Sequence, residues 1–370
     1  MKRVLSIFGT RPEAIKMAMV VKELGKYPDL FDAKVCVTAQ HREMLDQVLR
    51  IFSIKPDFDL DLMQDNQTLS GLTARVFTEL APIVSEVDPD WILVQGDTTT
   101  VMAASLVAFY QHVKVGHVEA GLRTHDKWRP FPEEINRRIA GVVSDLHFAP
   151  TETAKRHLLQ EGVNPDCIFV TGNPVIDSLH HVSTMDFDPQ DSLLAGIPWE
   201  KEIILLTAHR RENFGQPLKN ICHAVKEIAR MFEEQIHIVY PVHLNPRVSK
   251  LVHRKLGGVN NISLLPPLDY LPLVYLMKRS TLVLTDSGGI QEEAPGLGKP
   301  VLVLREKTER PEAVEAGTVR LVGTNSKRII SETKRLLEDQ EHYQAMATAV
   351  NPYGEGTSAQ QIVEILRDDG

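Results

Sequence analysis

The sequence has little of what marks secreted, membrane-bound or nucleic-acid-binding proteins. Only three cysteines occur in 370 residues, and Cys36, Cys167 and Cys222 are too few and too widely spaced for a disulfide framework or a metal motif. No apolar run is long enough to cross a bilayer, and the run at the N-terminus stops at Gly9, too early for a signal peptide. We therefore expect a cytoplasmic protein that does not engage a membrane.

Positive charge is not in excess either. The formal net charge is −8 and acidic and basic residues are interspersed, which argues against nucleic acid or a membrane surface as the main partner. Low-complexity tracts and short repeats are absent from the sequence. Hydrophobic residues make up 43% of the chain, enough for sizeable cores, and the length suggests two domains.

Two cofactor signatures are missing as well. The first predicted strand, Val4 to Phe8, leads through a turn into a helix, but the turn lacks the G-x-G-x-x-G spacing of dinucleotide sites. The acidic residues that follow the predicted strands do not gather into the tight cluster that a metal-bound diphosphate needs. We expect neither NAD nor a metal.

The most informative stretch that is present runs from Thr281 to Arg310. A short apolar strand is followed by Ser287, Gly288 and Gly289, in which the two glycines allow a ligand to approach the backbone closely and the serine can cap a helix. The helix that begins there offers free N–H groups and the positive end of its dipole to an anion, and phosphate suits both. Glu293, one turn further on, can accept the hydroxyls of a ribose, and Arg310 supplies a cation. An ordinary strand–helix–strand unit with a glycine-rich loop is the alternative.

Strand and helix patterns alternate along two halves of similar length, which predicts doubly wound parallel sheets. Ligands of such sheets bind beyond the carboxyl ends of the strands. In the first half, charged residues occupy such places or the helices that follow: Arg11, Lys16, Asp97, Glu119 and Glu133. Three of them have a structural alternative: a helix N-cap for Asp97, a dipole partner for Glu133 and a solvated surface lysine for Lys16.

In the second half, His209 and His243 follow two consecutive predicted strands. Either alone is more often a satisfied structural histidine, but two at successive strand ends exceed what packing asks for. The break at Gly172-Asn173-Pro174 is the predicted hinge between the halves.

Nine segments together carry a resemblance that none would carry alone. They are FGTRPEAIKMA (Phe8–Ala18), TAQHREMLDQ (Thr38–Gln47), GDTTT (Gly96–Thr100), GHVEAGLRT (Gly116–Thr124), PEEINR (Pro132–Arg137), AHRREN (Ala208–Asn213), YPVHLNP (Tyr240–Pro246), TDSGGIQEEAP (Thr285–Pro295) and TERPEA (Thr308–Ala313). Over essentially the whole chain the sequence resembles the non-hydrolysing UDP-N-acetylglucosamine 2-epimerases of bacteria. The resemblance implies a GT-B type fold, with two Rossmann-like domains facing across a cleft. We expect the N-terminal domain over residues 1–172, with the C-terminal helix 355–370 packing back on it, and a UDP-binding domain over residues 173–354.

The family reaction inverts C2 of the sugar without NAD, by anti elimination of UDP to 2-acetamidoglucal and re-addition from the opposite face. By the resemblance, Asp97, Glu119 and Glu133 are the candidate acid/base groups, and His209 lies near the diphosphate. Our hypothesis is that Asp97 and Glu133 carry the protons while Glu119 orients or tunes them. Substrate binding is assigned to Arg11, Lys16, Ser287, Gly288, Gly289, Glu293 and Arg310.

Bacterial relatives also bind a second UDP-N-acetylglucosamine as an activator, and four residues match that site: Gln40, Gln67, Arg210 and His243. The resemblance further implies UDP-N-acetylglucosamine and UDP-N-acetylmannosamine as partners, a homodimer, and a role in supplying units for cell-surface polysaccharide. A GT-B glycosyltransferase, which needs an acceptor and one base, is the second interpretation. A non-catalytic nucleotide-sugar sensor is the third, and the number of strand-end carboxylates argues against it.

Overall fold

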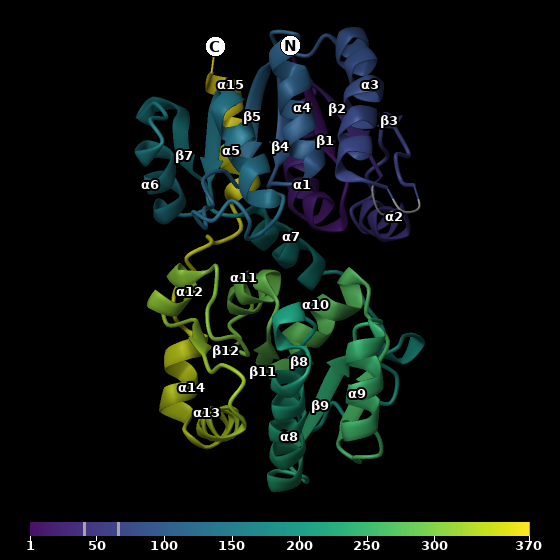
Figure 1. Ribbon diagram of the computed structural model, residues 1–370, viewed down its shortest axis with the longest axis vertical. Helices are drawn as coiled ribbons and strands as arrows, with labels where there is room; N and C mark the ends of the chain where they lie inside the picture. Colours follow the sequence, from purple (N-terminus) through teal and green to yellow (C-terminus); the bar gives the residue numbers. More distant parts are fainter. Residues whose placement is uncertain (40–41, 65–66, 370) are drawn as a thin grey trace. The chain divides into compact units, whose positions relative to one another are not determined.

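The computed structural model describes residues 1–39, 42–64 and 67–369 (Figure 1). The chain forms two compact units, the first made of Met1–Ser178 and Tyr353–Gly370 and the second of Leu179–Pro352. Every strand pair that the structure describes is parallel, and helices alternate with the strands, so the predicted class of two Rossmann-like α/β units is confirmed. The sequence placed the first boundary after residue 172; in the structure the chain enters the second unit six residues later, within helix α7 (Pro174–Ser183).

The first unit is built on a seven-stranded sheet with the order β3-β2-β1-β4-β5-β6-β7. The order reverses between β1 and β4, and a doubly wound sheet binds its ligand at such a switch point. Its strands read as continuous apolar runs because both faces are covered by helices. They are β1 (Lys2–Phe8), β2 (Phe31–Val37), β3 (Phe58–Asp59), β4 (Trp91–Gln95), β5 (Lys114–Val118), β6 (Leu146–Ala149) and β7 (Ile168–Val170).

The helices of the first unit begin mostly at a residue that caps them. Thr10 and Glu13 form a capping box at the start of α1, where Pro12 fits the first turn, and Thr98 caps α4. The helices are α1 (Arg11–Leu24), α2 (Arg42–Ile51), α3 (Leu69–Val87), α4 (Thr99–Tyr110), α5 (Glu133–Val143), α6 (Glu152–Gln160) and α15 (Ser358–Asp368), with a 3-10 turn at Pro165–Cys167.

The C-terminal segment belongs to the first unit because buried contacts hold it there. Asp177 accepts hydrogen bonds from the backbone N–H groups of Ser358 and Ala359 at 3.3 and 2.9 Å, and so caps α15 from another segment. At the other end of α15, the Lys2 ammonium donates to the carbonyl of Leu366 at 2.7 Å. These contacts satisfy groups that helix ends leave without intrahelical partners.

The second unit repeats the arrangement with six strands, in the order β10-β9-β8-β11-β12-β13 and with its switch point between β8 and β11. Its core joins the inner face of α8 to the strands. The strands are β8 (Glu202–Thr207), β9 (Ile236–Pro241), β10 (Ile262–Leu265), β11 (Ser280–Thr285), β12 (Val301–Val303) and β13 (Val319–Leu321). The helices are α8 (Gln216–Met231), α9 (Pro246–Leu256), α10 (Tyr270–Arg279), α11 (Gly288–Gly296), α12 (Pro311–Glu315), α13 (Ser326–Glu338) and α14 (Gln340–Ala347), with 3-10 turns at Pro189–Asp191 and Arg211–Asn213. Among the described residues, no helix is long and apolar enough to span a membrane.

Candidate active site

The carboxyl ends of β1, β4 and β5 lie side by side at the switch point of the first unit, because β4 pairs with both of the others. Asp97 comes two residues after β4, and Glu119 follows β5 directly. Gln95 is level with Val118 in the register of these two strands. The two carboxylates predicted from strand ends are therefore on adjacent strands of one sheet edge, which we call the first sheet edge, together with Thr10 and Arg11 after β1.

Glu119 is buried and held by donors from three different segments. Its Oε1 accepts from Lys16 Nζ at 2.5 Å and from Asn173 Nδ2 at 2.9 Å, and its Oε2 accepts from Gln95 Nε2 at 2.5 Å. The side chains of Glu119 and Lys16 are only 6% and 14% exposed, so this is a buried ion pair and the surface interpretation of Lys16 is wrong. Glu119 also has a φ of +64°, an uncommon conformation for a residue with a side chain and one that gathers at functional sites.

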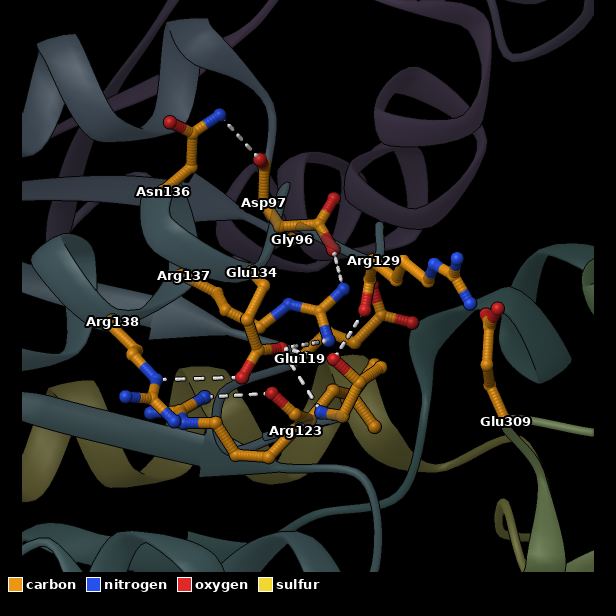
Figure 2. Close-up of polar contacts among 12 residues, drawn as sticks. Gly96, Asp97, Glu119, Arg123, Arg129, Glu134, Asn136, Arg137, Arg138 and Glu309 are labelled. Carbon is orange, nitrogen blue, oxygen red and sulfur yellow. Dashed lines mark hydrogen bonds and ion pairs between the residues drawn. The ribbon is translucent and has the colours of Figure 1, made fainter. Parts of the chain in front are cut away.

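Asp97 is the more accessible of the two carboxylates, with 27% of its side chain exposed. Its Oδ2 is paired with the Arg137 guanidinium, and its backbone carbonyl accepts from Asn136 Nδ2 at 3.0 Å (Figure 2). Asp97 is not the helix cap that was its structural alternative, because Thr98 occupies that position and accepts from the N–H of Val101. Asp97 is thus only partly covered, and its open side is available to a ligand.

The adjacent acids at the start of α5 have different surroundings. Glu134 is fully buried and accepts from the backbone of Thr124 and His125 at 3.0 and 3.1 Å, with Arg137 and Arg138 each at 3.4 Å (Figure 2). It therefore holds the loop before α5 in place. Glu133 instead faces a cavity of about 340 Å³ that is lined by Thr10, Gln67, Thr68, Leu69, Leu72, Thr98, Thr99, Pro132, Glu133 and Asn136.

His117 on β5 holds the turn that carries Asp97 in place. The ring Nε2 of His117 donates to the carbonyl of Gly96 at 2.7 Å, and burial lowers the pKa of His117 to about 4, so the ring is neutral. Glu13 joins the same region to β1: it accepts from the N–H of Gly9 at 2.9 Å and from the hydroxyl of Thr98 at 2.6 Å. Burial raises the pKa of Glu13.

In the second unit, the switch point brings the ends of β8 and β11 together. Asp286 is fully buried there and accepts from the backbone N–H groups of His209 and Arg210, both at 2.9 Å, and from Asn213 Nδ2 at 2.9 Å. Its Oδ1 lies 3.4 Å from Nδ1 of His209. Burial lowers the pKa of His209, with Asp286 acting in the opposite direction. The His243 ring stacks on that of His209 at a centroid distance of 5.5 Å.

Two guanidinium groups flank the start of α11. A Cβ built on Gly288 would lie 3.4 Å from Nη2 of Arg210 and 3.6 Å from Cζ of Arg310, so both cations reach the helix N-terminus. Arg310 is held by Glu292, whose Oε1 accepts from its Nε at 2.6 Å. Ser287 is the N-cap residue of α11, yet within the described chain its side chain makes no capping bond. The end of β11 therefore presents backbone N–H groups, a helix dipole and two cations, of which Arg310 is held by Glu292, and together these suit a phosphate-bearing ligand. We call these residues, with His209, the second sheet edge.

Glu293 lies one turn into the same helix and is 7% exposed. The hydroxyl of Tyr270 donates to its Oε1 at 3.0 Å. Its Oε2 would lie 3.7 Å from a Cβ built on Gly289, so the glycine leaves the space beside this oxygen open. This arrangement is compatible with a carboxylate that accepts ligand hydroxyls.

Several predicted residues are placed less decisively. Arg11 is the first residue of α1 and is half-buried. Gln67 lines the cavity next to Glu133 and accepts from Arg75 at 2.7 Å. Gln40 lies outside the described residues. Sequence reasoning missed Arg137, Asn173, Asp286 and Tyr270, which contact predicted residues from other segments. Only the first three fall within or beside motifs that could have pointed to them.

Among the described residues, no group of three or more histidines, cysteines or acids is arranged to hold a metal ion. The alternating acids of the segment 57–61 pair with cations: Lys34 Nζ lies 3.4 Å from Asp57, and Arg42 Nη1 lies 2.6 Å from Asp59 and 3.6 Å from Asp61.

The two doubly wound units, one with strand-end carboxylates and one with a cationic helix start, place the chain among two-domain Rossmann-like proteins with a site suited to a phosphate-bearing ligand. Residues 22–367 match the family model described as UDP-N-acetylglucosamine 2-epimerase. The chain is 56% identical to the UDP-N-acetylglucosamine 2-epimerase of Escherichia coli K12 over 99% of both chains. The chain belongs to the UDP-N-acetylglucosamine 2-epimerase family.

Solved structures agree with this assignment. The epimerase from Neisseria meningitidis, solved with UDP-GlcNAc bound, is 50% identical with a TM-score of 0.89, covering 98% of this chain and 99% of that one. The epimerase from Methanocaldococcus jannaschii, in complex with UDP-GlcNAc and UDP, is 34% identical with a TM-score of 0.80 over 98% and 99% of the two chains. The predicted non-hydrolysing family and the GT-B fold class are confirmed.

Proposed function

We propose that this protein is an isomerase that interconverts UDP-N-acetylglucosamine and UDP-N-acetylmannosamine by inverting C2. The observation that carries the proposal is the pairing of carboxyl side chains with cationic ones at the first sheet edge, Glu119 with Lys16 and Asp97 with Arg137, in a chain of this family. Inversion at a carbon needs a group that removes a proton and a group that returns one, and carboxylates at adjacent strand ends suit this task.

The proposed reaction is an elimination followed by an addition. A carboxylate takes the C2 proton, the C–H electron pair forms the C1–C2 double bond of 2-acetamidoglucal, and UDP leaves with the electrons of the C1–O bond. UDP then adds back to C1 while a second acid delivers a proton to the other face of C2. No atom is oxidised or reduced overall, so the reaction as written needs no NAD.

Asp97 and Glu133 are the proposed proton carriers, because Asp97 is partly exposed and Glu133 faces a cavity. Glu119, which is buried among its hydrogen-bond donors, is proposed to orient these two proton carriers. In the second unit, Arg310, His209 and the amides after Ser287 stabilise the leaving diphosphate, and Glu293 accepts the ribose hydroxyls. Charge-assisted hydrogen bonds of this kind contribute about 1.5–3 kcal/mol each. Arg11 and Lys16 complete the proposed binding set.

Incubation with UDP-N-acetylglucosamine in D2O without an acceptor tests the function. We expect UDP-N-acetylmannosamine to form and deuterium to replace the C2 proton of both sugars. Proton NMR measures both changes. A glycosyltransferase or a sensor would leave C2 unlabelled, and that outcome would reject the proposal.

A second molecule of UDP-N-acetylglucosamine is the proposed activator. Arg210 at the start of α11 and His243 stacked on His209 connect that predicted site to the second sheet edge, while Gln67 lies beside Glu133. The reverse reaction, started from UDP-N-acetylmannosamine alone, should then lag until UDP-N-acetylglucosamine is added. We also propose that the enzyme is a cytoplasmic homodimer that supplies cell-surface polysaccharide synthesis.

A further inference from the structure

Asn173 contacts Glu119 but is not among the residues that the sequence predicts for the site. It is 1% exposed, and its Nδ2 donates to Oε1 of Glu119 at 2.9 Å. Its Oδ1 accepts from the N–H of Val175 at 3.2 Å, and its own N–H donates to the carbonyl of Tyr353 at 2.8 Å. One residue thus joins the buried carboxylate, the start of α7 and the returning C-terminal segment.

The two segments around Asn173 are packed backbone to backbone. A Cβ on Gly172 would lie 2.9 Å from the carbonyl of Tyr353 and 3.4 Å from Cα of Gly354, and both glycines have positive φ. Such contacts leave no room for a side chain and fix the segments to each other. The amide of Asn173 is therefore anchored on both sides, at the places where the chain leaves the first unit and returns to it.

The donors of Glu119 differ in what they can fix. Lys16 contributes a compact charge on a flexible stem, which stabilises the carboxylate without directing it. The amide of Asn173 is planar and its other polar groups are occupied, so its N–H has a set direction. Together with Gln95 on β4, it determines the plane of the Glu119 carboxylate.

We propose that Asn173 is a positioning residue: it fixes the orientation of Glu119 at the first sheet edge through an amide anchored to the paired segments at Gly172 and Gly354. This inference rests on the proposed function, in which Glu119 orients the groups that move the C2 proton. Without the amide, proton transfer slows while UDP binding in the second unit is retained. Slow reprotonation also gives the intermediate time to leave, so free 2-acetamidoglucal and UDP accumulate.

The test uses Asn173→Asp in the full chain. Aspartate keeps the acceptor that caps α7 and the backbone bond to Tyr353, but it replaces the amide donor with a second carboxylate beside Glu119. We expect C2 deuterium exchange to fall about 10- to 100-fold, the factor that loss of a hydrogen bond to a charged group represents, with UDP affinity within about threefold. NMR should also detect released 2-acetamidoglucal.

Asn164→Asp is the matched control, because Asn164 caps the 3-10 turn at Pro165–Cys167 with its side-chain oxygen and is exposed. It should exchange at the wild-type rate. Asn173→Ser, which can cap α7 but is too short to reach Glu119, should reproduce the loss and is compared if the aspartate lowers the unfolding temperature. Wild-type exchange in either folded Asn173 variant would overturn the inference, whereas absence of exchange in the wild type would reject the proposed function instead.

Discussion

Each unit has its own doubly wound sheet with a switch point, yet the two sheet edges differ in which member of an ion pair is the more exposed. At the first sheet edge, the more buried Arg137 guanidinium, with 10% of its side chain exposed, holds Asp97, whose side chain is 27% exposed. At the second, the carboxylate Glu292 lies behind Arg310 and holds it at 2.6 Å. The fold fixes where ligand groups meet the protein, and in each of these two pairs the more exposed partner has the charge that the proposed function uses, a carboxylate for protons at the first edge and a cation for phosphate at the second.

Exposure of the two strand-end aspartates shows the same contrast. The side chain of Asp97 is 27% exposed and that of Asp286 is fully buried. The Asp286 carboxylate accepts hydrogen bonds from the backbone N–H groups of His209 and Arg210. It therefore holds the backbone of the second edge in place and is not itself exposed to a ligand. Asp97 instead keeps part of its side chain exposed. Equivalent places after a strand therefore do not imply equivalent roles.

The largest expected effect comes from removing basicity at the first edge. Asp97→Asn and Glu133→Gln keep the shape of each side chain, and general acid–base groups contribute roughly 10²- to 10⁴-fold. Each should lower C2 deuterium exchange by that factor and leave UDP affinity, measured by calorimetry, within a few-fold. Asp88→Asn, at an exposed pair with Arg3, is the control without effect. Near wild-type exchange in either variant would remove that residue as a proton carrier and make Glu119 the next candidate.

Acid should destabilise the interior of the first unit. Burial lowers the pKa values of His117 and His147, on adjacent strands, to about 4. Because their pKa in the unfolded chain is near 6.5, the unfolded state binds more protons between these values. Stability is then fully present above pH 6.5 and falls as the pH drops toward 4, by about 3 kcal/mol per histidine at most.

Amide hydrogen exchange of β5 and β6 between pH 7 and pH 4.5, corrected for intrinsic rates, measures this loss. His147→Gln removes one titrating ring and should flatten the pH dependence. An equally steep dependence in that variant would contradict the assignment of the acid effect to His147.

Substitutions at the second sheet edge should change the affinity for UDP, whereas those at the first should change the rate of C2 exchange. Glu293→Ala removes the proposed ribose acceptor, and loss of hydrogen bonds to a charged group corresponds to a weakening of UDP binding by about 10- to 100-fold. Calorimetry with UDP measures the change. Glu338→Ala, an exposed carboxylate on α13, is the control. Unchanged affinity in Glu293→Ala would exclude the ribose-acceptor role.

Sequence patterns predicted the strand ends of both units well, because apolar runs followed by polar turns are local features. The apolar runs of the sequence predict strands over Trp91–Gln95, Leu146–Ala149 and Ile262–Leu265, and these coincide with the observed β4, β6 and β10. The short edge strands β3 and β13 were not predicted, since two or three residues carry no periodicity. The local sequence pattern also did little to distinguish the role of Glu133 from that of Glu134, although Glu134 is fully buried and Glu133 lines a cavity.

The partners of the site residues could not be predicted for a physical reason. Asn173 reaches Glu119 across 54 positions of sequence, and Arg137 reaches Asp97 across 40. Such pairs depend on strand order and on how α5 and α7 pack, which a single sequence does not specify. The charge of the side chains at a sheet edge can be predicted from the residues that follow its strands. The residues that hold each charged group in place come from elsewhere in the chain.

The smallest expected effect tests one such supporting residue, Tyr270. Tyr270→Phe deletes the hydroxyl that donates to Glu293 at 3.0 Å and leaves the carboxylate in place. Since a single hydrogen bond contributes about 1 kcal/mol net, UDP affinity should fall about fivefold.

The double variant decides whether Tyr270 acts through Glu293. If the hydroxyl only orients the carboxylate, Tyr270→Phe should add almost nothing in the Glu293→Ala background, so the two changes are not additive. Full additivity would mean that Tyr270 contributes to UDP binding independently. Turnover at saturating substrate should change little in Tyr270→Phe, because the proposed proton carriers lie at the other edge. A loss of turnover as large as that of Asp97→Asn would break the division between an edge that handles protons and an edge that binds phosphate.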